Sequence, residues 1–186
     1  MKLYRRIPGL HAFFTSIPNR QLDRLATGPD QVWVGDITYV KVAGAWRDLA
    51  VVMDRYSRRI IGWSLRASKD TRLTLAAFHR AVRNRRPRRA SSSTATVASS
   101  TAYPFRNRLA ALGFVQSMNR PGEITDNAFM ESFFHSMKSD TVHGFTFADD
   151  TDLEQLLRSY IPYYNGVRLH SGIGYCSPVQ YEARAT

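Results

Sequence analysis

The sequence predicts one α/β domain with a mixed sheet, and three observations support this. Three strand-like runs follow one another early in the chain, a helical period replaces them at residue 71, and short strand-like and helical runs alternate afterwards. A chain of 186 residues that is 44% hydrophobic can build one hydrophobic core, which excludes wholesale disorder. Cys176 is the only cysteine, so a small disulfide scaffold is excluded as well.

Composition and the positions of proline and glycine divide the chain into three parts. Residues 1–30 have no clear period and contain Pro18, Gly28 and Pro29, so we expect an N-terminal arm or linker there. The core is expected over residues 31–165, with an aberrant stretch at 89–102. Residues 166–186 are expected to form a basic C-terminal tail of that core.

The first three elements are predicted to be an antiparallel meander. The run QVWVGDITYVKV at 31–42 is rich in β-branched and aromatic residues, and Gly44 follows it as a turn. Residues 46–53 and 59–65 predict two more strands, the first joined by a hairpin and the second through DRYSR. The tryptophans lie on these strands and are expected in the core: Trp33, Trp46 and Trp63.

The remaining elements are predominantly helical. Apolar residues recur at helical spacing over 71–85, with Asp70 as the expected N-cap and Pro87 beyond the end. The other predicted elements, in order, are a short helix at 106–112 stopped by Gly113, a short strand at 114–118, a helix at 126–138 capped by Thr125 or Asp126, and a helix at 149–164.

The net charge predicts an anionic partner. The chain has 26 Lys plus Arg against 15 Asp plus Glu, a formal charge of +11, and such an excess favours nucleic acid because neutralised phosphates release counterions. A cationic surface that only keeps the protein soluble is the alternative. No apolar run approaches the roughly 18–20 residues that span a bilayer. Pro8, Gly9 and His11 interrupt the start where a signal peptide needs apolar residues, so a cytosolic protein without membrane contact is expected.

Two carboxylates stand where they could do chemistry. Asp36 lies in the middle of the most apolar strand, where a carboxylate is costly unless it is paired, hydrogen-bonded or bound to a cation. Helical spacing places Asn127, Glu131 and His135 on one face, with Lys138 one turn further, a set that suits a metal meeting a phosphate. The alternatives are that Asp36 faces water and that the helix presents an ordinary solvated face.

Four segments resemble one family. They resemble segments of the catalytic domain of bacterial insertion-sequence transposases related to retroviral integrases, and they occur in the same order. The segments are WVGDITYV, DLAVVMDRYSRRIIGWSL, QSMNRPGEITDNAFMESFFHSMKSD and YYNGVRLHSGIGYCSPVQYE. The resemblance covers about residues 31–182. It implies a ribonuclease-H-like fold, with helices flanking a mixed five-stranded sheet that begins with a three-strand meander. It also implies DNA (element ends and target) as partner, a homo-oligomer on DNA, and a bacterial cytosolic protein associated with the nucleoid.

The family resemblance implies a catalytic set of two Asp and one Glu, which hold two Mg²⁺ or Mn²⁺ ions for strand transfer. On this chain the first Asp corresponds to Asp36 and the Glu to Glu131. The middle Asp is expected with 35 residues between it and the Glu, where Ala95 stands. Two hard cations about 4 Å apart need a bridging carboxylate, so without it we expect weak metal binding and negligible strand cleavage. Asp54 is expected to order the DRYSR turn and not to substitute.

Residues 90–102 contain only Ala, Ser, Thr and Val. In this stretch the family resemblance implies a core strand and a segment close to HSDRGSQY. If the codons of residues 93–101 are read one base earlier, the genetic code allows the shifted frame to encode HSDRG, one ambiguous residue and then QY. It also permits apolar residues of the missing strand further upstream. We therefore hypothesise two compensating frameshifts around 89–102, from gene decay or a sequencing error. A low-complexity insertion in a functional protein is the alternative.

Basic residues near the implied site are candidate DNA contacts. Lys138 suits a phosphate, and weaker candidates are Asn127, His135, Arg168 and His170. For His135, a surface histidine with no ligand is the favoured interpretation. Two function classes remain open: a transposase catalytic domain acting by divalent-metal phosphoryl transfer, and a catalytically dead remnant that binds DNA or a transposase partner. A ribonuclease-H-type nuclease is disfavoured by the SMNRPG and YNGVRLHS segments.

Overall fold

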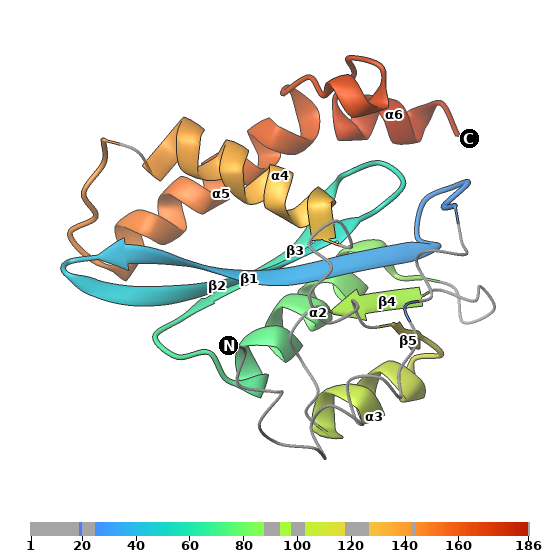
Figure 1. Ribbon diagram of the computed structural model, residues 1–186, viewed down its shortest axis with the longest axis horizontal. Coiled ribbons are helices and arrows are strands. Elements are labelled where there is room, and N and C mark those ends of the chain that lie inside the picture. Colours follow the sequence, from blue (N-terminus) through green and yellow to red (C-terminus); the bar gives the residue numbers. More distant parts are fainter. Residues whose placement is uncertain are drawn as a thin grey trace, which may run out of the picture.

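The computed structural model describes residues 19, 25–87, 94–97, 103–117, 127–142 and 144–185, with only the main chain described over 94–97. Its elements form three layers (Figure 1). A central sheet separates helices α2 and α3 on one face from α4, α5 and α6 on the other. The sheet has five strands in the order β3-β2-β1-β4-β5, which confirms the predicted mixed α/β architecture.

The predicted meander is confirmed. Strands β1 (Val32–Val42), β2 (Ala45–Asp54) and β3 (Ile60–Arg66) pair antiparallel in sequence order. Gly44 sits in the β1–β2 turn with φ at +82°, a left-handed conformation that glycine adopts without steric cost.

Two of the three tryptophans lie in the core. Trp33 is 1% exposed and Trp63 is 8% exposed, as predicted. The prediction for Trp46 is wrong, because its side chain is 58% exposed. It is the second residue of β2, and the buried part of that strand begins only at Leu49.

Strands β4 (Thr94–Val97) and β5 (Val115–Ser117) extend the sheet with parallel pairing. We expected the low-complexity patch to lack its core strand, yet the main chain of 94–97 pairs with Val32–Gly35 on one side and with β5 on the other. The expectation of a lost strand is therefore corrected: ladder hydrogen bonds use main-chain groups, which Ala, Thr and Val all supply.

Helix α2 (Thr71–Arg85) begins and ends as its sequence predicts. The Asp70 carboxylate caps it by accepting a 2.9 Å hydrogen bond from the Leu73 main-chain N–H. The helix lies very close to β3, because a Cβ placed on Gly62 would come within 2.3 Å of the Ala77 carbonyl oxygen. Glycine at residue 62 is thus what allows β3 and α2 to approach.

Helix α3 (Tyr103–Ala111) begins three residues earlier than predicted and is followed by Gly113, whose φ is +78°. Helix α4 (Ala128–Met137) continues into a π-helical turn at Lys138–Val142. Its N-cap is Asn127, whereas the predicted caps at 125 and 126 lie outside the described residues.

Helix α5 (Asp150–Gly166) has Asp149 as N-cap, and helix α6 (Pro178–Ala183) follows a short 3₁₀ turn at Ser171–Ile173. The apolar stripe of α5 packs with α4 against one face of the sheet and forms the larger core. In the described part of the chain, no helix has the length and apolar character needed to cross a bilayer.

Candidate functional site

Asp36 lies half-buried on β1, opposite Val51 of β2. Side chains alternate along a strand, so Asp36 shares its face of the sheet with Val34 and Val40, which belong to the core beneath α4 and α5. The strand period therefore directs the carboxylate toward α4, which packs against β1.

Asn127 joins α4 to this carboxylate. Its side-chain Nδ2 donates a 2.6 Å hydrogen bond to Asp36 Oδ2. Asn127 occupies the N-cap position of α4, yet its side chain makes no capping hydrogen bond to its own helix. An amide that commonly caps a helix is used here to hold a carboxylate on a neighbouring strand.

Burial raises the pKa of the Asp36 carboxyl above its ordinary value of 3.8, and the negative charge of Glu131 raises it further. Hydrogen bonds from the Ile37 main chain and Asn127, together with the positive charge of Lys69, oppose this rise only in part. The two predicted carboxylates are therefore close enough for their charges to interact. A cation between them would offset both the cost of burying the Asp36 charge and its repulsion by Glu131.

The remaining predicted residues of α4 lie along its exposed side. Glu131 and His135 are exposed, one turn apart, and Lys138 is half-buried at the start of the π-helical turn. Lys138 Nζ lies 4.8 Å from the centroid of the Tyr39 ring on β1, and burial lowers the pKa of this ammonium.

Residue 95 is not level with Asp36. In the parallel β1–β4 pair, Ala95 lies opposite Trp33, and the last residue of β4, Val97, lies opposite Gly35. Asp36 follows Trp33 by three positions, a displacement of roughly 10 Å along the strand. In this register β4 ends one position before the level of Asp36.

The donor set of the described residues does not fit a two-metal site. Among the described residues, no group of three His, Cys, Asp or Glu side chains comes together as possible metal ligands. A pair of Mg²⁺ ions needs several carboxylate oxygens and a bridging ligand. Asp36 and Glu131, with the Asn127 amide already bonded to Asp36, fall short of that requirement.

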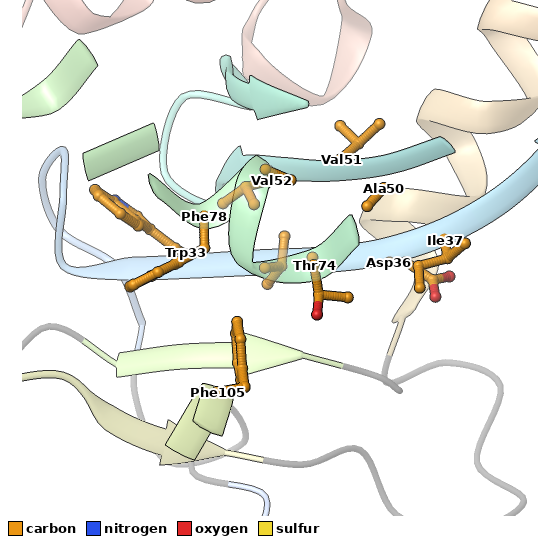
Figure 2. A pocket seen from close by; sticks show the side chains of 12 residues that line it. Trp33, Asp36, Ile37, Ala50, Val51, Val52, Thr74, Phe78 and Phe105 are labelled. Carbon is orange, nitrogen blue, oxygen red and sulfur yellow. The ribbon is translucent and has the colours of Figure 1, made fainter. Parts of the chain in front are cut away.

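A small apolar cavity lies between β1 and α2, beside Asp36. It is lined by side chains that include Trp33, Thr74, Phe78 and Phe105, and Figure 2 shows Asp36 at its end. Its volume of about 20 Å³ suffices for about one water molecule, so it cannot hold a nucleotide.

Arg168 and His170 are held by structural contacts. Arg168 Nε lies 3.1 Å from Asp140 Oδ2 of the π-helical turn. His170 is 6% exposed, and its ring packs edge-on against Tyr164 at 4.5 Å. Burial, followed by the charge of Arg168, lowers the pKa of His170. The buried ring offers little surface for the DNA contact that the sequence suggested.

An ion cluster that the sequence did not predict ties the C-terminal helix to the core. Arg85 Nη2 lies 2.7 Å from Glu182 Oε1, and Arg85 Nε lies 2.7 Å from Asp30 Oδ1. Asp54 is fully buried within this cluster and accepts main-chain hydrogen bonds from Asp30, Tyr56 and Ser57. The predicted turn-ordering role of Asp54 agrees with these bonds. No local spacing in the sequence connects Arg85 to Glu182, which lies 97 positions further along the chain.

Comparisons with known proteins agree with this architecture. The integrase core domain family matches residues 26–123, and a second integrase core domain pattern matches residues 131–185. The chain is 37% identical over 162 residues to the transposase InsF for insertion sequence IS3A of Escherichia coli, covering 86% of this chain and 56% of that protein. It is 34% identical over 159 residues to the transposase for insertion sequence element IS904 of Lactococcus lactis, covering 84% and 63%. The chain thus spans little more than half the length of these relatives.

Solved integrases share the fold. The intasome of simian T-cell lymphotropic virus in complex with PP2A regulatory subunit B56 gamma matches with a TM-score of 0.72 at 16% identity, over 86% of this chain and 56% of that one. The HTLV-2 integrase catalytic core domain in complex with magnesium matches with a TM-score of 0.61 at 15% identity, over 83% and 97%. The ribonuclease-H-like fold implied by the resemblance is confirmed. The chain therefore belongs to the integrase core domain family.

Proposed function

We propose that this chain is the catalytic core of a DNA transposase in which the carboxylate set for two-metal phosphoryl transfer is incomplete. The observation that carries the proposal is the placement of Asp36 and Glu131, which interact electrostatically without a third carboxylate among the described residues. Its transposase relatives and its net charge of +11 support DNA as the partner.

In this proposal Asp36 and Glu131 hold at most one divalent ion weakly, and Asn127 orients Asp36 through its 2.6 Å hydrogen bond. Lys138 and His135 are the proposed phosphate contacts, because His135 lies one turn from Glu131 on α4 and Lys138 begins the π-helical turn that continues this helix. The proposal also includes assembly on DNA as a homo-oligomer, a place in the bacterial cytosol at the nucleoid, and the division into an arm (1–30), a core (31–165) and a tail (166–186).

The test measures single-turnover cleavage and strand transfer of labelled element ends with Mg²⁺ and with Mn²⁺. The full chain is compared with a variant in which residues 89–102 are replaced by the segment encoded in the shifted frame, and with Ala95→Asp. We expect no product from the chain itself and product from the replaced segment. Because residue 95 lies opposite Trp33, Ala95→Asp alone should restore less activity than the whole segment.

Cleavage by the unchanged chain at the rate of the replaced segment would overturn the proposed deficiency. No product from either chain, while duplex DNA still binds with a steep salt dependence, would favour the DNA-binding remnant over a repairable transposase core. The nucleotide sequence of codons 85–105 tests the frameshift hypothesis separately, and a shifted frame without an HSDRG-like segment would refute it.

A further inference from the structure

The end of the β1–β2 hairpin carries two exposed aromatic rings in contact. Tyr39 and Trp46 are each 58% exposed, and their ring centroids lie 5.0 Å apart at an interplanar angle of 84°. Tyr39 and Lys41 project from the same face of β1, and Trp46 lies opposite Lys41 in the antiparallel register. The rings therefore form one surface patch beyond the buried part of the hairpin.

Two ammonium groups complete the patch. Lys138 Nζ lies 4.8 Å from the Tyr39 ring centroid, and Lys41 Nζ lies 6.0 Å from the Trp46 ring centroid. In the described part of the chain, neither lysine makes an ion pair within 4.0 Å. We call Tyr39, Lys41, Trp46 and Lys138 the hairpin patch.

The chemistry of the hairpin patch matches a nucleotide. Aromatic rings stack on nucleobases, and ammonium groups neutralise the phosphates on either side, which is how proteins hold single strands without reading their sequence. Bases inside a duplex already stack on one another and do not offer their faces to a side chain. The hairpin patch is thus suited to unpaired nucleotides.

The position of the patch connects it to the carboxylates. Tyr39 follows Asp36 by three residues on β1, roughly 10 Å along the strand, and by strand alternation it projects from the opposite face of the sheet. Lys138, seven residues after Glu131, joins the two sides, because its Nζ lies 4.8 Å from the Tyr39 ring centroid. We propose that the hairpin patch binds unpaired DNA nucleotides that flank the Asp36 and Glu131 site. This inference rests on the proposed function, because it takes DNA as the partner.

A second copy of this chain fits the patch less well. A symmetric contact through the patch would bring the two lysines of one copy against the same two lysines of the other. Like charges at an interface oppose association, whereas a phosphate backbone is attracted to all of them.

Trp46 supplies the readout. Trp33 and Trp63 are buried, so Trp46 is the tryptophan that a bound base can reach. The full chain is titrated with a single-stranded thymidine oligonucleotide of about 12 nucleotides, a length within known site sizes, and with a duplex of equal length. We expect the single strand to quench tryptophan fluorescence strongly and the duplex to quench it little.

Variants then assign the binding. Tyr39→Ala and Trp46→Ala should weaken single-strand binding, measured by fluorescence anisotropy, by about 5- to 100-fold each and leave duplex binding unchanged. Trp46→Phe should retain most of the affinity, because it keeps a stacking ring. Lys41→Ala should lower the salt slope of binding by about one. The control is Tyr163→Ala, an exposed aromatic residue on α5 that lies outside the patch.

The outcomes separate the two proposals. Failure to bind either oligonucleotide would refute the proposed DNA function and this inference together. Duplex binding with single-strand affinity unchanged by Tyr39→Ala and Trp46→Ala would refute the hairpin patch alone. Concentration-dependent dimerisation that Trp46→Ala abolishes, without quenching by the single strand, would assign the patch to a second copy and overturn the inference.

Discussion

Arg85 and Glu182 form a two-pronged ion pair across the fold. Arg85 Nη1 lies 2.9 Å from Glu182 Oε2 and Nη2 lies 2.7 Å from Oε1, with both side chains about one-tenth exposed. Arg59 and Ser57 also donate to the same carboxylate. Helix α6 is thereby held to the end of α2 and to the β2–β3 turn, although 97 residues separate the two partners.

Glu182→Ala should destabilise the fold substantially. Breaking a largely buried pair leaves an arginine without its best partner, so we expect the free energy of unfolding to fall by about 2–4 kcal/mol in urea denaturation. Glu154→Ala is the matched control, because its i,i+4 pair with Arg158 is exposed and should contribute only about 0.3–0.5 kcal/mol. Equal losses from both variants would contradict a special role for α6 docking.

The same carboxylate gives a pH dependence. Burial alone would raise the pKa of Glu182, but hydrogen bonds from Arg85, Ser57 and Arg59 outweigh it and hold the pKa below its ordinary value of 4.5. A lowered pKa in the folded state stabilises the protein above pH 4.5, and this contribution is lost as the pH falls through the folded value. The stability difference between wild type and Glu182→Gln should therefore shrink below pH 4.5, as thermal unfolding across acid pH would reveal.

Gly62→Ala should weaken the packing of β3 on α2. The new Cβ would lie 2.3 Å from Ala77 O and 2.7 Å from Ala81 N, both main-chain atoms that cannot move independently. We expect a loss of about 1–3 kcal/mol or more in the free energy of unfolding. Gly166→Ala, at the last residue of α5 with open space around it, should instead raise the free energy of unfolding by about 0.4–1 kcal/mol, because alanine restricts the unfolded chain more than glycine. An unchanged free energy of unfolding for Gly62→Ala would mean that β3 and α2 can move apart at little energetic cost.

Asp36→Asn should stabilise the protein while reducing cation binding. The raised pKa of Asp36 reflects burial and the charge of Glu131, and an amide removes both costs while still accepting the Asn127 hydrogen bond. We expect the free energy of unfolding, measured by thermal denaturation, to rise by about 0.5–2 kcal/mol, because functional sites are commonly built at the expense of stability. Mn²⁺ titration followed by calorimetry should show binding weaker than in the wild type. A loss of stability would indicate that the ionised carboxylate is structurally required.

Local patterns predicted most of the elements. The strand at 32–42, the helix at 71–85 and its Asp70 cap follow from side-chain period and short-range hydrogen bonding, and the structure confirms them. The prediction that Trp46 is buried failed because the alternation of a strand shows which side chains share a face, but not where along the strand that face becomes exposed. The Arg85–Glu182 pair was missed because it depends on how α6 docks, which no short window of sequence contains.

The site was predictable in part for the same reason. Period-2 alternation placed Asp36 on one face of its strand, and helical spacing placed Asn127 and Glu131 on one face of the predicted helix. Their meeting depends on how α4 lies against β1, which sequence spacing alone does not specify. The level of residue 95 relative to Asp36 depends on strand register, and register is set by tertiary pairing.

The pairing of β4 through main-chain groups has an evolutionary consequence. Main-chain pairing at 94–97 keeps the strand order of the sheet, so maintaining the fold places little constraint on which side chains stand there. A gene copy can drift there for many generations and still encode a domain of unchanged outline. Under the proposed function, such a product would compete with intact copies for the same DNA.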